Sequence, residues 1–108
     1  MVRGGGPSTP LPAARKAWAF GTWYNPHIWG AGVAVAASLQ LLAVLPAHTP
    51  PSLAVAEPML EFDRTEHPIR QAILLVPIEH ANGIVRIPQG AGLGIEVDRG
   101  ALDRFRAQ

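Results

Sequence analysis

The stretch from Ala17 to Ala56 contains no Asp, Glu, Lys or Arg, and residues 31–45 within it are rich in Ala and Leu. We expect a helix over residues 31–45, because Ala and Leu favour helices and Pro46 ends the run. Its polar members, Ser38 and Gln40, project about 200° apart at about 100° per residue. The helix therefore has no wide polar face, and it must be covered nearly all round by protein or by lipid.

Length and charge limit the kinds of protein that this chain can be. The 108 residues have room for one small domain, and the formal net charge is +1. Lys and Arg do not cluster with aromatic residues, so we expect no nucleic-acid partner. The lack of cysteine excludes disulfides, thiolate zinc sites and cysteine nucleophiles, and it leaves the cellular compartment open.

The first half of the chain predicts a disordered segment, a helix and a strand. Residues 1–12 hold three consecutive glycines and three prolines, so we predict disorder there. Helix formers from Ala13 to Phe20 predict a helix that Gly21 ends. The β-branched and aromatic residues 22–25 predict a short buried strand.

The second half predicts short elements separated by turns. Residues 59–63 predict a second short strand, and the apolar residues 69–77 predict an extended segment. Asn82-Gly83 lies between apolar runs and predicts a β-hairpin, because both residues tolerate positive φ.

The C-terminal part begins with Gly90, Gly92 and Gly94. A dinucleotide fingerprint needs such glycines to open a helix directly after a strand, whereas residues 95–97 here predict a strand. We therefore interpret the glycines as a tight turn and expect no bound cofactor. Asp98 is a candidate N-cap for a last helix from Arg99 to Arg106.

His27 is the main candidate for a functional side chain. It follows an extended aromatic segment and precedes Gly30 and Gly32, where a helix begins. In barrels of alternating strands and helices, reactive side chains lie where a strand ends and the next loop begins. Imidazole can move a proton at neutral pH if a neighbour fixes its tautomer, which Asp63 or a residue outside this chain would do. The alternative is a histidine without a functional role.

Glu61 and Asp63 are the acidic candidates. The functional interpretation makes Glu61 a hydrogen-bonding or acid group toward an enolate oxygen, and the alternative is two solvated carboxylates. His48, His67 and His80 lack the spacing of metal ligands, so we expect no metal site from them.

Several stretches of the chain together resemble the C-terminal portion of the mandelate racemase and muconate lactonizing enzyme family of the enolase superfamily. The similarity runs in family order from about Ala13 to Arg106. The stretches are Ala13-Ala14-Arg15-Lys16, Pro26-His27-Ile28-Trp29-Gly30, Ala34 to Leu41, Leu60-Glu61-Phe62-Asp63 and Gly83 to Asp98.

The resemblance implies an α/β fold with a partial (β/α) barrel, of the TIM-barrel type, in residues 13–63. This part would hold the last two barrel strands and the helix between them. Residues 64–108 would form a tail in the α+β capping region, with the hairpin and the short C-terminal helix. The resemblance also implies a lyase or isomerase that removes the proton α to a carboxylate with the help of Mg²⁺, most like the sugar-acid dehydratases and cycloisomerases.

The resemblance further assigns two catalytic residues. His27 matches the histidine after the seventh barrel strand, the general base or acid, and Glu61 matches the glutamate after the eighth strand, which hydrogen-bonds the enediolate. The metal-binding carboxylates, the lysine base and the aspartate partner of the histidine have no counterpart, and Lys16 is the sole lysine. We therefore expect a cytoplasmic C-terminal fragment that binds no Mg²⁺ and is inactive alone. The acid-sugar substrate belongs to the full-length family, and we expect a homo-oligomeric or paralogue contact as the partner of this chain.

Two other interpretations stay open. The uncharged stretch, preceded by Arg15 and Lys16, is typical of a single-pass membrane anchor or a long signal peptide, although Gln40 lies inside it. Alternatively, the helix and the hairpin form an interaction fragment that docks on a full-length paralogue.

Overall fold

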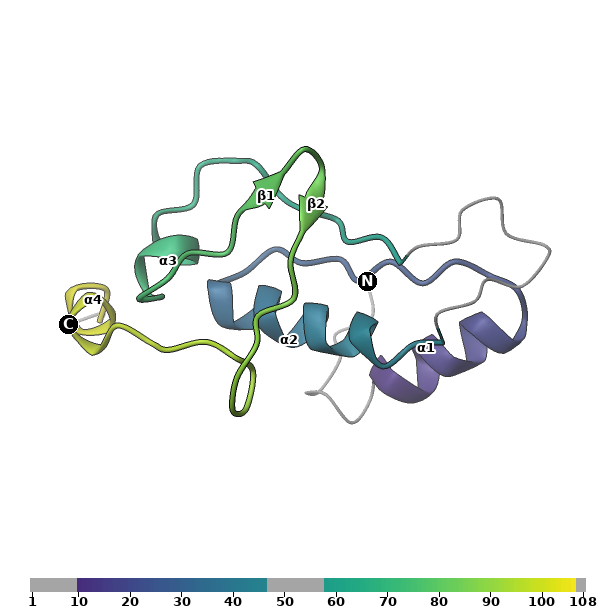
Figure 1. Ribbon diagram of the computed structural model, residues 1–108. Coiled ribbons are helices and arrows are strands. Elements are labelled where there is room, and N and C mark those ends of the chain that lie inside the picture. Colours follow the sequence, from purple (N-terminus) through teal and green to yellow (C-terminus); the bar gives the residue numbers. More distant parts are fainter. Residues whose placement is uncertain (1–9, 47–57, 107–108) are drawn as a thin grey trace.

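The computed structural model describes residues 10–46 and 58–106 (Figure 1). The elements are α1 (Pro10–Ala19), α2 (Gly32–Ala43), α3 (Pro68–Ala72), β1 (His80–Ala81), β2 (Ile84–Val85) and α4 (Arg99–Arg104). The disorder predicted for residues 1–9 lies outside the described residues. Residues 10–12 are helical instead of disordered, because proline fits the first turn of a helix, where no N–H partner is needed.

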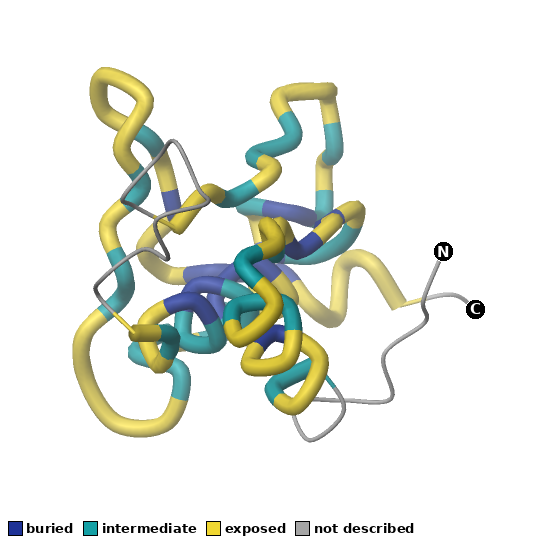
Figure 2. The backbone as a smooth tube through the Cα atoms, turned by 90° about the vertical axis from the view of Figure 1, so that its right-hand side faces the viewer, coloured by how far each residue is buried: buried dark blue, intermediate teal, exposed yellow. Residues whose placement is uncertain are grey.

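Helix α2 is the centre of the core. It buries Val35, Ala36 and Leu39 against Ile28 and a cluster from the second half of the chain, and the buried segments gather around it in Figure 2. The Gln40 side-chain amide donates to the carbonyl oxygens of Pro88 (2.9 Å) and Leu93 (3.3 Å), so this polar side chain is satisfied by protein.

The cover of α2 is less complete than its composition predicts. Val33 and Ala34 in its first turn and Ala43 at its end are exposed, whereas the helix residues between them are buried or partly buried by the described part of the chain.

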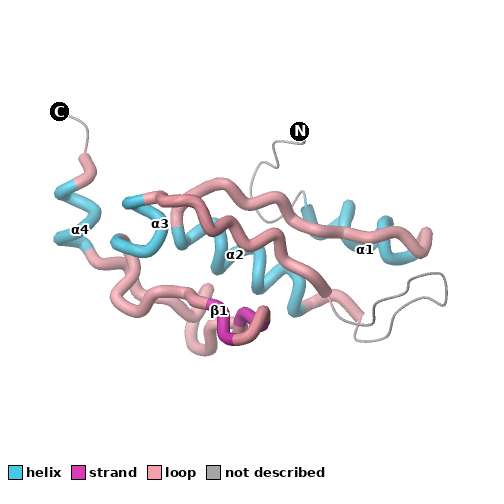
Figure 3. Tube along the Cα trace, turned by 90° about the horizontal axis from the view of Figure 1, so that it is seen from above, coloured by secondary structure: helices cyan, strands magenta, loops and turns pink. Residues whose placement is uncertain are grey.

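The two predicted barrel strands are extended segments without strand partners. Residues 22–29 and 58–63 run over α2 (Figure 3), but neither is part of a sheet, and β1 and β2 form the sheet of the described residues. A strand needs hydrogen bonds from a neighbouring strand, and the described part of the chain offers none to these segments. The fold is a small α+β arrangement in the described residues, and the predicted (β/α) barrel detail is not confirmed.

The structure confirms the predicted hairpin and the predicted last helix. Asn82 and Gly83 have φ values of 52° and 80°, and β1 pairs antiparallel with β2, with His80 opposite Val85. Such a two-residue turn matches the twist of the strands. Asp98 caps α4, since its Oδ1 accepts the N–H of Ala101 at 2.9 Å. The helix ends at Arg104, somewhat before the predicted Arg106.

The prediction of an extended segment over residues 69–77 was wrong at its start, where α3 forms. His67 caps this helix, because its Nδ1 accepts the N–H of Arg70 at 3.2 Å, and Pro68 occupies the first turn. Pro68 was a local helix signal that the apolar run obscured, whereas histidine is not a residue typical of N-caps. The strand predicted over residues 95–97 is reduced to one bridge, between Leu74 and Val97.

Candidate functional site

His27 and Glu61 lie together on the two extended segments. His27 Nδ1 and Glu61 Oε2 are 2.8 Å apart, and the two side chains are 56% and 57% exposed. The residues are 34 positions apart in the sequence, so tertiary packing brings them into contact. Sequence analysis selected both residues for the same site, and the structure places them side by side.

The neighbours of each residue explain why both side chains face outward. Pro26 and Ile28 are buried on either side of His27, and Leu60 and Phe62 are partly buried on either side of Glu61. In an extended chain, successive side chains point to opposite sides. Burial of the apolar neighbours therefore turns the imidazole and the carboxylate toward solvent.

The contact with Glu61 determines which ring nitrogen of His27 carries the proton. An ionised carboxylate has no proton to donate, so the proton of this hydrogen bond belongs to His27 Nδ1. The neutral ring then keeps a lone pair on Nε2, which can accept a proton from a ligand. The tautomer-fixing neighbour that we expected to be Asp63 or an outside residue is Glu61.

Asp63 has a different environment. Its Oδ1 accepts the N–H and the hydroxyl of Thr65, both at 2.7 Å, and its Oδ2 pairs with the guanidinium of Arg70. The two hydrogen bonds from Thr65, aided by the charge of Arg70, hold the pKa of the Asp63 carboxyl below its ordinary value of 3.8. Asp63 thus organises the loop after Glu61 and does not contact the imidazole.

Arg70 is the residue of this region that sequence analysis missed. It is 6% exposed, and it holds the loop of Asp63 through side-chain hydrogen bonds. A single arginine inside the apolar run of residues 69–77 was the available signal, because a buried charge needs a partner of opposite charge.

The other histidines do not join His27. His67 caps α3, and His80 accepts a hydrogen bond from Arg64 Nη1 at 2.9 Å through Nε2. His48 lies outside the described residues. Across residues 10–46 and 58–106, His, Asp and Glu do not gather into a group of three that could hold a metal ion. This part of the chain therefore does not fit a resident Mg²⁺, and we derive no step through the metal.

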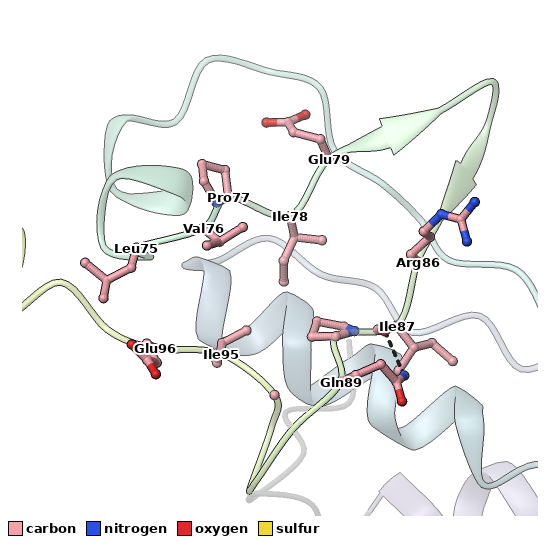
Figure 4. Close-up of a pocket in the computed structure, with 12 residues that line it drawn as sticks. Leu75, Val76, Pro77, Ile78, Glu79, Arg86, Ile87, Gln89, Ile95 and Glu96 are labelled. Atoms are coloured by element: carbon pink, nitrogen blue, oxygen red, sulfur yellow. Dashed lines mark hydrogen bonds between the residues drawn. The ribbon is translucent and has the colours of Figure 1, made fainter.

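A separate groove lies away from the His27–Glu61 pair. It has a volume of about 440 Å³ and runs between residues 75–79 and residues 86–96, with Leu75, Val76 and Ile95 on its walls (Figure 4). His27 and Glu61 do not line it. The groove and the His27–Glu61 contact are therefore two separate features of the described residues.

The helices of the described residues do not reach the length and apolar character needed to cross a bilayer. The membrane-anchor interpretation finds no support there.

Comparison with known proteins assigns the chain to a family. The enolase C-terminal domain-like family matches residues 1–101, and the chain belongs to this family. The resemblance predicted from the separated motifs is thereby confirmed at the level of the superfamily.

One relative has a defined activity. The chain is similar to D-galactarolactone cycloisomerase of Agrobacterium fabrum (strain C58 / ATCC 33970), with 48% identity over 104 residues. The match covers 94% of this chain and 27% of the relative, so the chain spans about a quarter of that protein's length.

Proposed function

We propose that this chain provides the C-terminal part of a sugar-acid cycloisomerase or dehydratase active site, with His27 as the residue that moves a proton α to a carboxylate. The observation that carries the proposal is the 2.8 Å contact between His27 Nδ1 and Glu61 Oε2 on an exposed edge. The similarity to a galactarolactone cycloisomerase supports an acid sugar or its lactone as the substrate class.

The two side chains have different roles in the proposed reaction. Glu61 fixes the Nδ1 proton with one carboxylate oxygen, and His27 Nε2 then accepts or returns the proton on the substrate carbon. Glu61 can donate a hydrogen bond to the enediolate only in its protonated form, so the ionised carboxylate in this contact serves to orient the imidazole. An enediolate needs strong electrostatic stabilisation, which the superfamily draws from Mg²⁺ and which the described residues are not arranged to supply. The chain alone is therefore inactive under this proposal and works with residues from the remainder of a barrel.

The test uses a chimera and the chain alone. In the chimera, this chain replaces the matching 104 residues of the Agrobacterium cycloisomerase, and turnover of D-galactarolactone is measured. We expect an active chimera, a loss of about 10²–10⁴-fold in kcat for His27→Asn, and no turnover by the chain alone. Glu61→Gln should also lower kcat, whereas Glu79→Gln, an exposed control carboxylate, should not. A His27→Asn chimera with full activity would contradict the proposal.

The docking of this chain on a full-length paralogue stays a prediction. Co-purification of the tagged chain with such a paralogue would test it.

A further inference from the structure

Arg70 holds the loop that follows Glu61. Its Nη1 donates to the carbonyl oxygens of Asp63 (2.7 Å) and Thr65 (3.2 Å), and its Nη2 pairs with Asp63 Oδ2. The guanidinium is planar and presents its donors in a rigid fork, so these bonds set both the position and the orientation of the loop. Glu61 lies two residues before Asp63, so the position of its backbone depends on these contacts of Arg70.

The backbone of Arg70 contacts the segment that carries His27. Gly32 begins α2, and a Cβ at Gly32 would lie 2.5 Å from the Arg70 carbonyl oxygen and 2.5 Å from Leu74 Cδ1. Only glycine permits this approach. The short loop from His27 to Gly32 is therefore held against the same turn of α3 that holds the Glu61 loop.

The packing around Arg70 joins these two contacts. A small hollow of about 10 Å³ is lined by Ile28 beside His27, by Glu61 and Asp63, and by Arg70. Glu61 and the buried Arg70 thus border the same packed spot, and Ile28 joins it to the segment that carries His27.

We propose that Arg70 is a positioning residue, which holds the Glu61 carboxylate in hydrogen-bond contact with the His27 imidazole from the opposite side of the site. The effect of Arg70 on catalysis rests on the proposed function. The dependence of the His27–Glu61 contact on Arg70 does not, and it can be measured on the chain itself.

The first experiment measures the contact by NMR on the full chain with ¹⁵N-labelled histidine. The readouts are the proton resonance on His27 Nδ1 and the nuclear Overhauser effect between the His27 ring and the Glu61 side chain. We expect both signals in the wild type and in the control Arg86→Met, which removes an exposed arginine. Arg70→Met should lose both signals. Arg70→Lys should give weaker signals, because one ammonium cannot make all three contacts.

A folded Arg70→Met chain that retains both signals would overturn the proposal. If Arg70→Met does not fold, Arg70→Lys decides, because it keeps the positive charge but cannot make all three contacts. Weaker signals in a folded Arg70→Lys chain support the proposal, and signals as strong as those of the wild type overturn it.

The second experiment uses the chimera described above. Arg70→Met should lower kcat about 10- to 100-fold and change KM less than about 3-fold, because it displaces a group that acts in the transition state. An inactive wild-type chimera together with an intact NMR contact would contradict the proposed function and leave the positioning role standing. An active wild-type chimera whose kcat is unchanged by Arg70→Met would contradict the positioning role alone.

Discussion

The Arg70–Asp63 ion pair and the His27–Glu61 hydrogen bond lie within a few residues of each other and differ in their exposure. The side chains of Arg70 and Asp63 are 8% and 17% exposed, whereas those of His27 and Glu61 are 56% and 57% exposed. A buried pair must satisfy its charges internally, and it holds its elements in one arrangement. An exposed pair contributes little to stability but leaves its atoms accessible to a ligand. The comparison separates a structural pair from a pair that is open for chemistry.

The largest expected effect on stability comes from breaking the buried pair. Arg70→Met leaves Asp63 Oδ2 and two carbonyl oxygens without the donor that they share, and we expect the free energy of unfolding to fall by about 3 kcal/mol. Urea denaturation followed by circular dichroism measures this change, with Arg86→Met as the control. A change equal to that of the control would remove the distinction between the two pairs.

The next effect comes from the contact between α2 and α3. Gly32→Ala places a methyl group within 2.5 Å of the Arg70 carbonyl oxygen, so we expect a loss of about 1–3 kcal/mol from overpacking. Gly30→Ala is the matched control, because its Cβ would meet Ala34 Cβ at an ordinary 3.5 Å. Equal stability of the two variants would show that α2 does not depend on this close approach.

The pH dependence of stability further distinguishes the buried pair from the exposed one. Because the folded chain lowers the pKa of Asp63, mainly through the Thr65 hydrogen bonds, its ionised form stabilises folding. This contribution is present above the unfolded-state value of 3.8 and is lost as the pH falls through the lower folded-state value. We expect the wild type to lose more stability than Asp63→Asn between neutral pH and pH values below 3.8. Parallel losses in urea denaturation would contradict this role of Asp63.

The smallest effect on stability belongs to the exposed pair. Glu61→Gln should change the free energy of unfolding by about 0–1 kcal/mol, because solvent screens the interaction. The same variant should nevertheless lower kcat in the chimera. Glu79→Gln should affect neither quantity. A destabilisation by Glu61→Gln as large as that by Arg70→Met would show that the exposed pair is structural too.

Local signals predicted some elements well and others poorly. The Asn82-Gly83 turn, the Asp98 cap and the helix that became α2 follow from φ preferences, hydrogen bonds within a few residues and helix propensity. The helix α3 was missed although Pro68 is typical of a first helical turn, because an apolar run favours strand and helix equally. The predicted strands over residues 22–25 and 59–63 did not form in the described chain, because a strand is completed by a partner.

The sequence by itself determined the turns, the caps, the family and the identity of His27 and Glu61 as candidates. These features depend on the residue types and on interactions between near neighbours. Only the tertiary structure decided that Glu61 faces His27, that Asp63 turns to Arg70, and that α3 packs against both segments. These contacts join segments far apart in the chain, and the free energy of packing around α2 brings them together.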